Sequence, residues 1–249
     1  MLYLIFSDIH SNLEALNRML KEIPKIKPDA FVFLGDLVGY GPNPNEVINK
    51  VRKIKHMFLV RGNHDKVASE IEGSDYFNMI AERAIRWTAK KVSMENKKFI
   101  KNMPKGPLLI KNEITIFHGS FFDEDYYIMN PYDALLNIQS SPTNISFFGH
   151  THQPIIYKYS PNNDFEIMTL KSGKNRISIP LDKNSMYLIN PGSIGQPRDK
   201  DSRISFMTYD TKTMQLNYYR FRYPFLKTAA KIKKQKLPPF LGDRLSKGV

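Results

Sequence analysis

Cysteine is absent from this chain of 249 residues, which excludes disulfide bonds, iron–sulfur clusters and thiolate zinc sites. Apolar runs long enough to cross a bilayer are also absent, and no basic leader or cleavage-like segment precedes the first motif. We therefore expect a soluble, cytoplasmic protein without membrane contacts. Any metal ion must be held by His, Asp, Glu or Asn side chains.

Acidic residues are scarce at the end of the chain. From residue 220 onward, nine Lys or Arg accompany one acid, Asp243, so this segment carries +8 of the formal net charge of +13. A basic surface of this kind is typical of nucleic-acid binding. Because the other residues carry only +5 of the +13, we favour a compositional bias toward lysine over a nucleic-acid interface.

The hydrophobic pattern predicts a single α/β domain over residues 1–249, because a chain of this length forms one sizeable core. Strands and amphipathic helices alternate at the start, and this βαβαβ order predicts a parallel sheet. The second half is richer in strands, which suggests two packed sheets with helices outside. The expected strands are 2–6, 31–34, 57–60, 114–117, 145–148, 155–159, 186–190, 204–210 and 214–221, and the expected helices are 11–22, 43–54 and 76–91.

Two further segments lie outside this alternation of strands and helices. Residues 160–185 are polar and are expected to form an exposed hairpin or loop. Residues 223–249 are expected to form a basic helical segment, in which Pro224 opens a helix that Pro238 and Pro239 end.

Five of the six histidines directly follow predicted strands: His10, His64, His118, His150 and His152. Asp36 follows another strand in the same way, whereas His56 precedes its strand and is expected at the surface. The carboxyl ends of strands in an open α/β sheet line one crevice, so these side chains should converge. Histidine with carboxylate and amide oxygen suits divalent cations of borderline hardness. The candidates outnumber the ligands of one ion, which predicts two ions about 4 Å apart.

The motifs SDIH (7–10), GDLVGYGP (35–42), GNHD (62–65), HG (118–119) and GHTH (149–152) occur in an order that closely resembles the calcineurin-like metallophosphoesterase superfamily. GYGPNPNEV, NPGSIGQPRD and LPPFLGDRL further resemble a bacterial and archaeal subgroup, described as phosphodiesterase-like or as similar to diadenosine tetraphosphate hydrolases. The resemblance implies a four-layer αββα sandwich, in which two mixed sheets pack face to face with helices outside and a dimetal centre lies at the strand ends.

The resemblance also implies roles for individual residues. A hydroxide bridging two ions (Mn, Fe, Zn, Co or Ni) would attack phosphorus, His64 would protonate the leaving oxygen, and Asp65 would orient His64. Asp36 would bridge the two ions. The implied ligands are Asp8, His10, Asp36 and His152 for one ion, and Asp36, Asn63, His118 and His150 for the other.

Other readings stay open for single motifs. GD, GNHD or HG alone is typical of a polar turn, and the functional reading rests on their combination. Many superfamily members carry a second acid and an Arg where this chain has Gly39, Tyr40 and Gly41, which argues against a phosphoprotein phosphatase. Tyr40 is expected either to stack on a base or sugar or to anchor its loop. Ser193 and Arg198 either contact substrate or belong to a turn-rich connection.

We expect a dimetal phosphoesterase that hydrolyses phosphodiester or nucleotide phosphoanhydride bonds in a small, nucleotide-like substrate. One alternative is a non-catalytic interaction scaffold, because some superfamily members use the fold for docking. Such proteins tend to lose ligands or the proton donor, and this chain retains both. A second alternative is a nuclease, which the basic C-terminal segment motivates.

Overall fold

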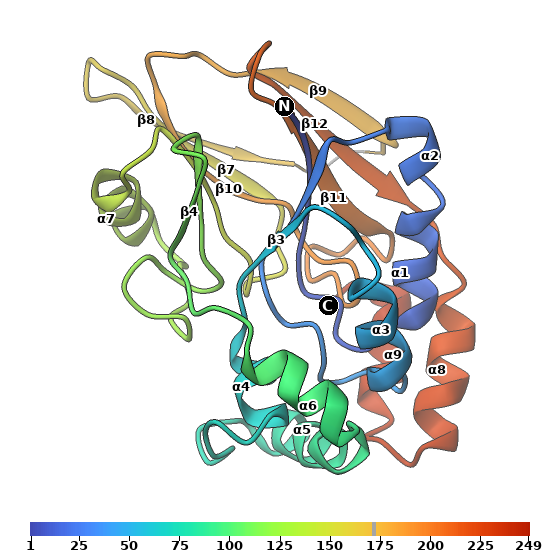
Figure 1. The fold of residues 1–249 in the computed structure, drawn as a ribbon. Helices are drawn as coiled ribbons and strands as arrows, with labels where there is room; N and C mark the ends of the chain where they lie inside the picture. Colours follow the sequence, from blue (N-terminus) through green and yellow to red (C-terminus); the bar gives the residue numbers. More distant parts are fainter. Residues whose placement is uncertain (171–172) are drawn as a thin grey trace.

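The structure, a computed structural model, describes residues 1–170 and 173–249 and contains two six-stranded sheets packed face to face (Figure 1). The first sheet has the order β3-β2-β1-β11-β12-β9, with β1, β2 and β3 parallel and the other strands antiparallel to their neighbours. Its strands are β1 (Leu2–Phe6), β2 (Ala30–Phe33), β3 (Met57–Leu59), β9 (Arg176–Pro180), β11 (Ile204–Asp210) and β12 (Gln215–Phe221).

The second sheet has the order β4-β5-β6-β10-β7-β8, in which β5, β6 and β10 are parallel. The carboxyl ends of these three strands lie beside those of β1 and β2, where backbone hydrogen bonds join the following loops. The strands of this sheet are β4 (Leu108–Ile110), β5 (Ile114–Ile116), β6 (Ile145–Phe147), β7 (Ile155–Tyr159), β8 (Phe165–Thr169) and β10 (Met186–Asn190).

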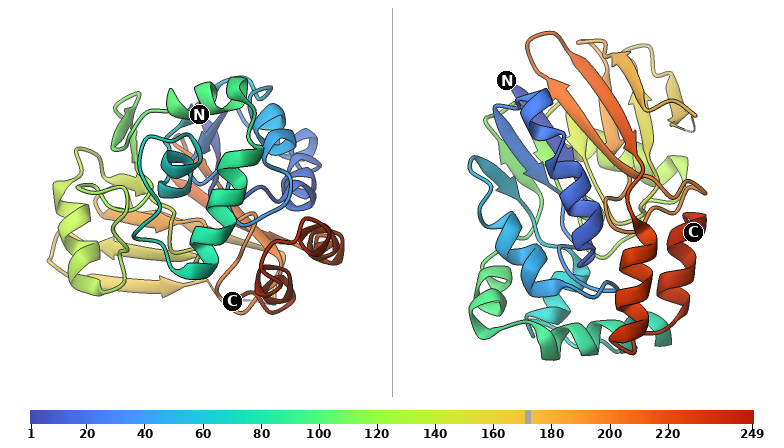
Figure 2. Two further views of the ribbon diagram at one scale, coloured as in Figure 1. Left: turned by 90° about the horizontal axis from the view of Figure 1, so that it is seen from below. Right: turned by 90° about the vertical axis from the view of Figure 1, so that its right-hand side faces the viewer.

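Helices cover the outer faces of both sheets, which confirms the predicted αββα sandwich (Figures 1 and 2). Helices α1, α3 and α6 pack on the first sheet, and α7 packs on the second. No helix in the described parts of the chain is both long and apolar enough to span a bilayer. The helices are α1 (Leu13–Leu20), α2 (Ile23–Ile26), α3 (Pro44–Val51), α4 (Asn63–Ala68), α5 (Met79–Lys91), α6 (Met94–Lys101), α7 (Pro131–Ser140), α8 (Phe225–Lys234) and α9 (Phe240–Lys247).

Strand β1 shows why the central strands are apolar throughout. Tyr3 and Ile5 face the second sheet, whereas Leu4 and Phe6 face the helices. All four side chains are fully buried, because both faces of the strand are covered. From Tyr3 to Phe6 the strand therefore has no solvent-facing position, and it ends just before the first polar motif.

The predicted elements are confirmed in type, with shifted ends. The first helix begins at Leu13 rather than residue 11, because the Asn12 side chain caps it by accepting from Ala15 N at 3.2 Å. The prediction of an exposed hairpin or loop at 160–185 is wrong in part. Strand β8 extends the second sheet and β9 extends the first, so this segment crosses between the sheets. Residues 171 and 172 of that prediction lie outside the described residues.

The basic C-terminal segment packs on the domain rather than extending from it. Thr228 Oγ1 donates to Asn12 Oδ1 at 2.9 Å, and Lys231 Nζ lies 2.5 Å from Glu14 Oε1. Apolar side chains of α8 and α9 also join a buried cluster with α5 and Tyr40. The last helix thereby reaches the end of the sandwich at which the histidine motifs lie.

Candidate metal centre

Six of the predicted ligands converge at the strand ends, and each is at most 2% exposed. They come from the loops after four strands, two in each sheet. Asp8 and His10 follow β1, Asp36 follows β2, His118 follows β5, and His150 and His152 follow β6.

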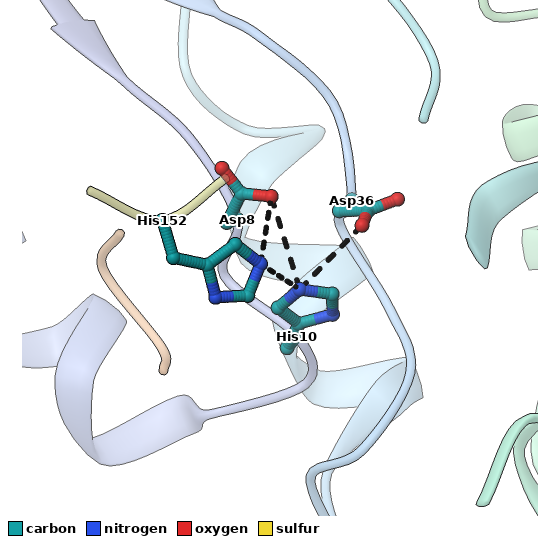
Figure 3. A group of neighbouring side chains, drawn as sticks. All are labelled: Asp8, His10, Asp36 and His152. Carbon is teal, nitrogen blue, oxygen red and sulfur yellow. Dashed lines mark hydrogen bonds and ion pairs between the residues drawn. The ribbon is translucent and has the colours of Figure 1, made fainter. Parts of the chain in front are cut away.

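The side chains form two groups that share Asp36. Figure 3 shows the first group, in which His152 Nε2 lies 3.0 Å from His10 Nε2 and 3.2 Å from Asp8 Oδ1. His10 Nε2 lies 3.5 Å from Asp36 Oδ2. In the second group, His118 Nε2 lies 3.4 Å from the same Asp36 oxygen and 3.0 Å from His150 Nδ1.

Backbone carbonyl groups fix the orientation of all four imidazole rings. A carbonyl oxygen only accepts, so the bonded ring nitrogen must donate, and the other nitrogen points into the cluster. The donors and acceptors are His10 Nδ1 to Val38 O (3.1 Å), His118 Nδ1 to Leu34 O (2.7 Å), His150 Nε2 to Asp125 O (3.1 Å) and His152 Nδ1 to Gln196 O (2.6 Å).

This arrangement suits a cation. Burial lowers the pKa of both His10 and His152, so their rings are neutral and turn lone pairs toward each other across 3.0 Å. Among the described residues, the buried oxygens Asp8 Oδ1 and Asn63 Oδ1 have no hydrogen-bond partner. Unpartnered buried oxygens cost free energy, and a metal ion would supply the missing contact. Asn63, the first residue of α4, therefore fits the predicted amide ligand.

Asp36 and His118 carry opposite charges at the centre. Burial opposes ionisation of Asp36, but the neighbouring His118, His64 and His10 imidazoles hold its pKa well below the ordinary value. Burial likewise opposes protonation of His118, but Asp36 raises the pKa of this histidine to about 10. The ionised carboxylate therefore creates a potential that favours a positive charge between these side chains.

The backbone at the site is strained. Five candidate ligands have a positive φ, a conformation that costs a non-glycine residue on the order of 1 kcal/mol or more. Only the surrounding hydrogen bonds and packing can maintain it. The angles are 54° at Asp8, 46° at His10, 59° at Asp36, 66° at His150 and 59° at His152.

His64 lies beside this cluster, with its ring 4.9 Å from that of His10 and 4.4 Å from that of Tyr40. Burial lowers its pKa to about 4, and its Nδ1 atom has no hydrogen-bond partner among the described residues. Gly39 permits this position, because a Cβ atom on Gly39 would lie 2.4 Å from His64 Nδ1. The predicted proton donor is thus close to the candidate ligands without belonging to either group.

Asp65 does not orient His64 as predicted. Its carboxylate accepts backbone N–H groups from Gly62 (3.1 Å), Leu37 (3.2 Å) and Val38 (3.2 Å). Asp65 therefore ties the loop after β2 to the start of α4. The prediction failed because this aspartate, two residues into a helix, turns toward unpaired backbone donors rather than toward the adjacent side chain.

The residues after β10 were expected either to contact substrate or to form a turn-rich connection, and the structure gives Ser193 and Arg198 different surroundings. Ser193 is fully buried, and its hydroxyl donates to Asp8 O at 2.9 Å, so it supports a candidate ligand rather than contacting substrate. Gln196, which the sequence analysis missed, binds His152 through its carbonyl oxygen. The Gln196 side-chain oxygen accepts from Arg198 and Arg244 at 3.0 Å each. Arg198 lies over the Tyr40 ring, 5.9 Å from its centroid.

A cavity of about 290 Å³ opens onto the centre, with Asn63, His64 and His150 in its wall. Asp125 and Tyr127, also missed, form another part of this wall, and the Tyr127 ring lies 3.7 Å from the His150 ring. Two larger hollows, of about 510 and 760 Å³, lie elsewhere, and none of the candidate ligands is among the described residues that line them. In the sequence, the aromatic and acidic residues that follow His118 could have indicated that this segment forms part of the cavity wall.

Comparison with known proteins agrees with the geometry. The model of a family described as the calcineurin-like phosphoesterase superfamily domain matches residues 1–214. Uncharacterized protein MJ0912 of Methanocaldococcus jannaschii is 37% identical over 251 residues, covering 98% of this chain and 97% of that protein. A metallophosphoesterase structure from Sphaerobacter thermophilus has a TM-score of 0.85 and 31% identity, covering 100% of this chain and 99% of that chain.

The fold also occurs in hypothetical protein PH1004 from Pyrococcus horikoshii, with a TM-score of 0.77 and 18% identity over 100% of this chain and 98% of that chain. Together with the buried Asp and His cluster, the family match supports a phosphoester hydrolase that binds divalent metal.

Proposed function

The chain belongs to the calcineurin-like phosphoesterase superfamily, and from this premise we propose that it uses two divalent ions to hydrolyse phosphodiester or nucleotide phosphoanhydride bonds. The observation that carries the proposal is the pair of buried ligand groups that share Asp36. An ion bound in one group alone would leave the inward-facing histidine nitrogens of the other group without a metal partner.

The proposed ligands follow the two groups. One ion would be held by Asp8, His10, Asp36 and His152, and the other by Asp36, Asn63, His118 and His150. Nitrogen and oxygen donors without sulfur suit Mn²⁺, Fe²⁺, Zn²⁺, Co²⁺ or Ni²⁺. When bound, the ions would lower the pKa of an attacking water molecule and offset negative charge on the phosphoryl oxygens.

His64 is the proposed proton donor to the leaving oxygen. It is buried beside the ligand groups, and one of its ring nitrogens has no partner among the described residues. Its pKa of about 4 makes the protonated form scarce at neutral pH. A bound phosphate would raise that pKa, because the negative charge lies next to the imidazole. Protonation would therefore accompany substrate binding.

The two alternative functions have less support. A docking scaffold would not need the retained ligand groups or His64. The basic C-terminal segment, which motivates a nuclease, is partly neutralised by the ion pair between Lys231 and Glu14. We therefore expect removal of metal, rather than of this charge, to abolish catalysis.

The test is hydrolysis of bis(p-nitrophenyl) phosphate by protein that is stripped with EDTA and reloaded with Mn²⁺, Co²⁺ or Ni²⁺. We expect turnover only after reloading, with about two ions per chain by mass spectrometry. Asn63→Ala should lose most of the activity and the second ion while keeping its circular dichroism spectrum. Gly73→Ala, at a site whose nearest contact is 3.6 Å away, is the control. A metal-loaded protein without turnover would refute the proposal.

A further inference from the structure

A second cavity adjoins the one at the candidate metal centre. It has a volume of about 450 Å³, and Tyr40, Asn78 and Tyr127 line both cavities. Its outer wall includes Arg198, from the loop after β10, and Arg244, from α9. A substrate bound at the metal centre would therefore reach this cavity past the two tyrosine rings.

The two arginines form an unusual pair. Both guanidinium groups donate to the same oxygen, Gln196 Oε1, so two positive charges lie close together. Among the described residues, the side-chain partner of both arginines is the neutral Gln196 amide and no Asp or Glu forms an ion pair with them, and Arg198 Nε is buried without a hydrogen-bond partner. Arg244 Nε donates to Val249 O. Two positive groups that share one acceptor repel each other, and an anion bound between them would offset this repulsion.

The pair lies near the metal centre. Arg198 N donates to His152 O at 3.3 Å, and the Tyr40 ring under the Arg198 guanidinium lies 4.7 Å from the His10 ring. Burial lowers the pKa of Arg244 to about 10, and the charge of Arg198 acts in the same direction. The pair is thus placed to bind a negative group that neighbours the reacting phosphorus.

Aromatic and apolar side chains complete the cavity. Phe240 is 48% exposed and Tyr127 is 43% exposed, although both are large hydrophobic residues. The Arg244 guanidinium lies 5.2 Å from the centre of the Phe240 ring. Exposed rings beside guanidinium groups are suited to stacking a planar base, while the charges bind its phosphates.

We propose that Arg198 and Arg244 form a second anion subsite, which selects nucleotides that carry at least one phosphate beyond the phosphate under attack. The aromatic wall then contacts the base. This inference rests on the proposed function for the position of the reacting phosphate, and it gives the C-terminal helix α9 a role in specificity. In the reaction, water loses a proton as its oxygen bonds to phosphorus, the bond from phosphorus to the leaving oxygen breaks, and the leaving oxygen takes up a proton.

The first experiment measures binding and needs no turnover. Isothermal titration of the Mn²⁺-loaded protein should show that the α,β-methylene analogue of ADP binds at least about tenfold more tightly than AMP, as expected for one charge-assisted contact. Arg244→Gln should abolish this preference, and Arg244→Lys should restore part of it. Lys247→Gln, an exposed change on the same helix, should leave it intact. Pyrophosphate should bind more weakly than the ADP analogue if the rings contact the base.

Equal affinity of the wild-type protein for AMP and the ADP analogue would overturn the subsite, and so would a preference that survives in Arg244→Gln. The second experiment compares kcat/KM for diadenosine tetraphosphate and bis(p-nitrophenyl) phosphate. Arg244→Gln should lower the ratio of these values at least about tenfold, whereas an unchanged ratio would contradict the inference. If neither compound is hydrolysed, the proposed function fails, while the titration still decides whether the subsite exists.

Discussion

Replacing Gly39 by alanine should destabilise the protein and impair catalysis, because the loop after β2 has no room for a side chain. Gly39 has a φ of 100°, and an added Cβ atom would lie 2.4 Å from His64 Nδ1 and 3.3 Å from His10 Nδ1. Backbone strain contributes about 1–2 kcal/mol. Overpacking against a buried ring contributes roughly 1–3 kcal/mol more. We therefore expect a loss of about 3 kcal/mol in the free energy of unfolding.

Urea denaturation of the metal-free protein measures this loss, with Gly73→Ala expected within about 0.5 kcal/mol of wild type. A double-mutant cycle separates the two contributions. When His64 is also changed to alanine, the Gly39 substitution should lower the free energy of unfolding less, by a difference of about 1 kcal/mol or more, because the imidazole ring that clashes with the added Cβ atom is absent. An unchanged free energy of unfolding in Gly39→Ala would refute the reasoning. A cycle without coupling would show that backbone strain alone acts.

Three further predictions concern His64 and the metal. His64→Ala should slow hydrolysis of esters with poor leaving groups much more than that of p-nitrophenyl esters, and equal losses across a leaving-group series would contradict a proton donor. In metal-free protein, His64 has a pKa of about 4 against 6.5 in the unfolded chain, so its stability contribution is complete above pH 6.5 and is lost as the pH falls toward 4. Urea denaturation should therefore show that the free energy of unfolding falls between pH 7 and pH 5 by about 2 kcal/mol more in the wild type than in His64→Ala. Parallel pH profiles of this free energy in the two proteins would contradict the prediction. Bound Mn²⁺ at one hundred times its Kd should raise the free energy of unfolding by about 2.7 kcal/mol, reversibly with EDTA, and an unchanged melting temperature would count against a preformed site.

The sequence was sufficient to predict the ligand cluster because each ligand follows an apolar strand. Asp8, Asp36 and His150 are far apart in the chain, yet parallel strands bring their carboxyl ends together, and this rule does not depend on side-chain detail. The structure places six of the predicted residues in two groups and leaves an unpartnered oxygen on Asn63. Their roles as ligands stay a prediction.

Features that depend on long-range packing escaped prediction. Asp65 follows His64 by one residue but bonds to the loop after β2, and nothing local indicates this preference. Arg244 is separated from Gln196 by 48 residues, and only the docking of α9 brings them together. Strand β9 alternates exposed and half-buried residues at a sheet edge, so its hydrophobic signal is weak.

Main-chain carbonyl oxygens orient the four histidine rings of the candidate centre. Substitutions near the rings and substitutions in the cavity walls should therefore have different effects during evolution. A substitution at Val38, Leu34 or Gln196 alters a side chain but leaves the carbonyl that holds a histidine. The cavity walls, in contrast, consist of side chains such as those of Tyr127 and Arg244. New substrates can therefore arise through replacements of these wall side chains, while the carbonyl contacts that orient the histidines persist through any side-chain change that the buried packing accepts.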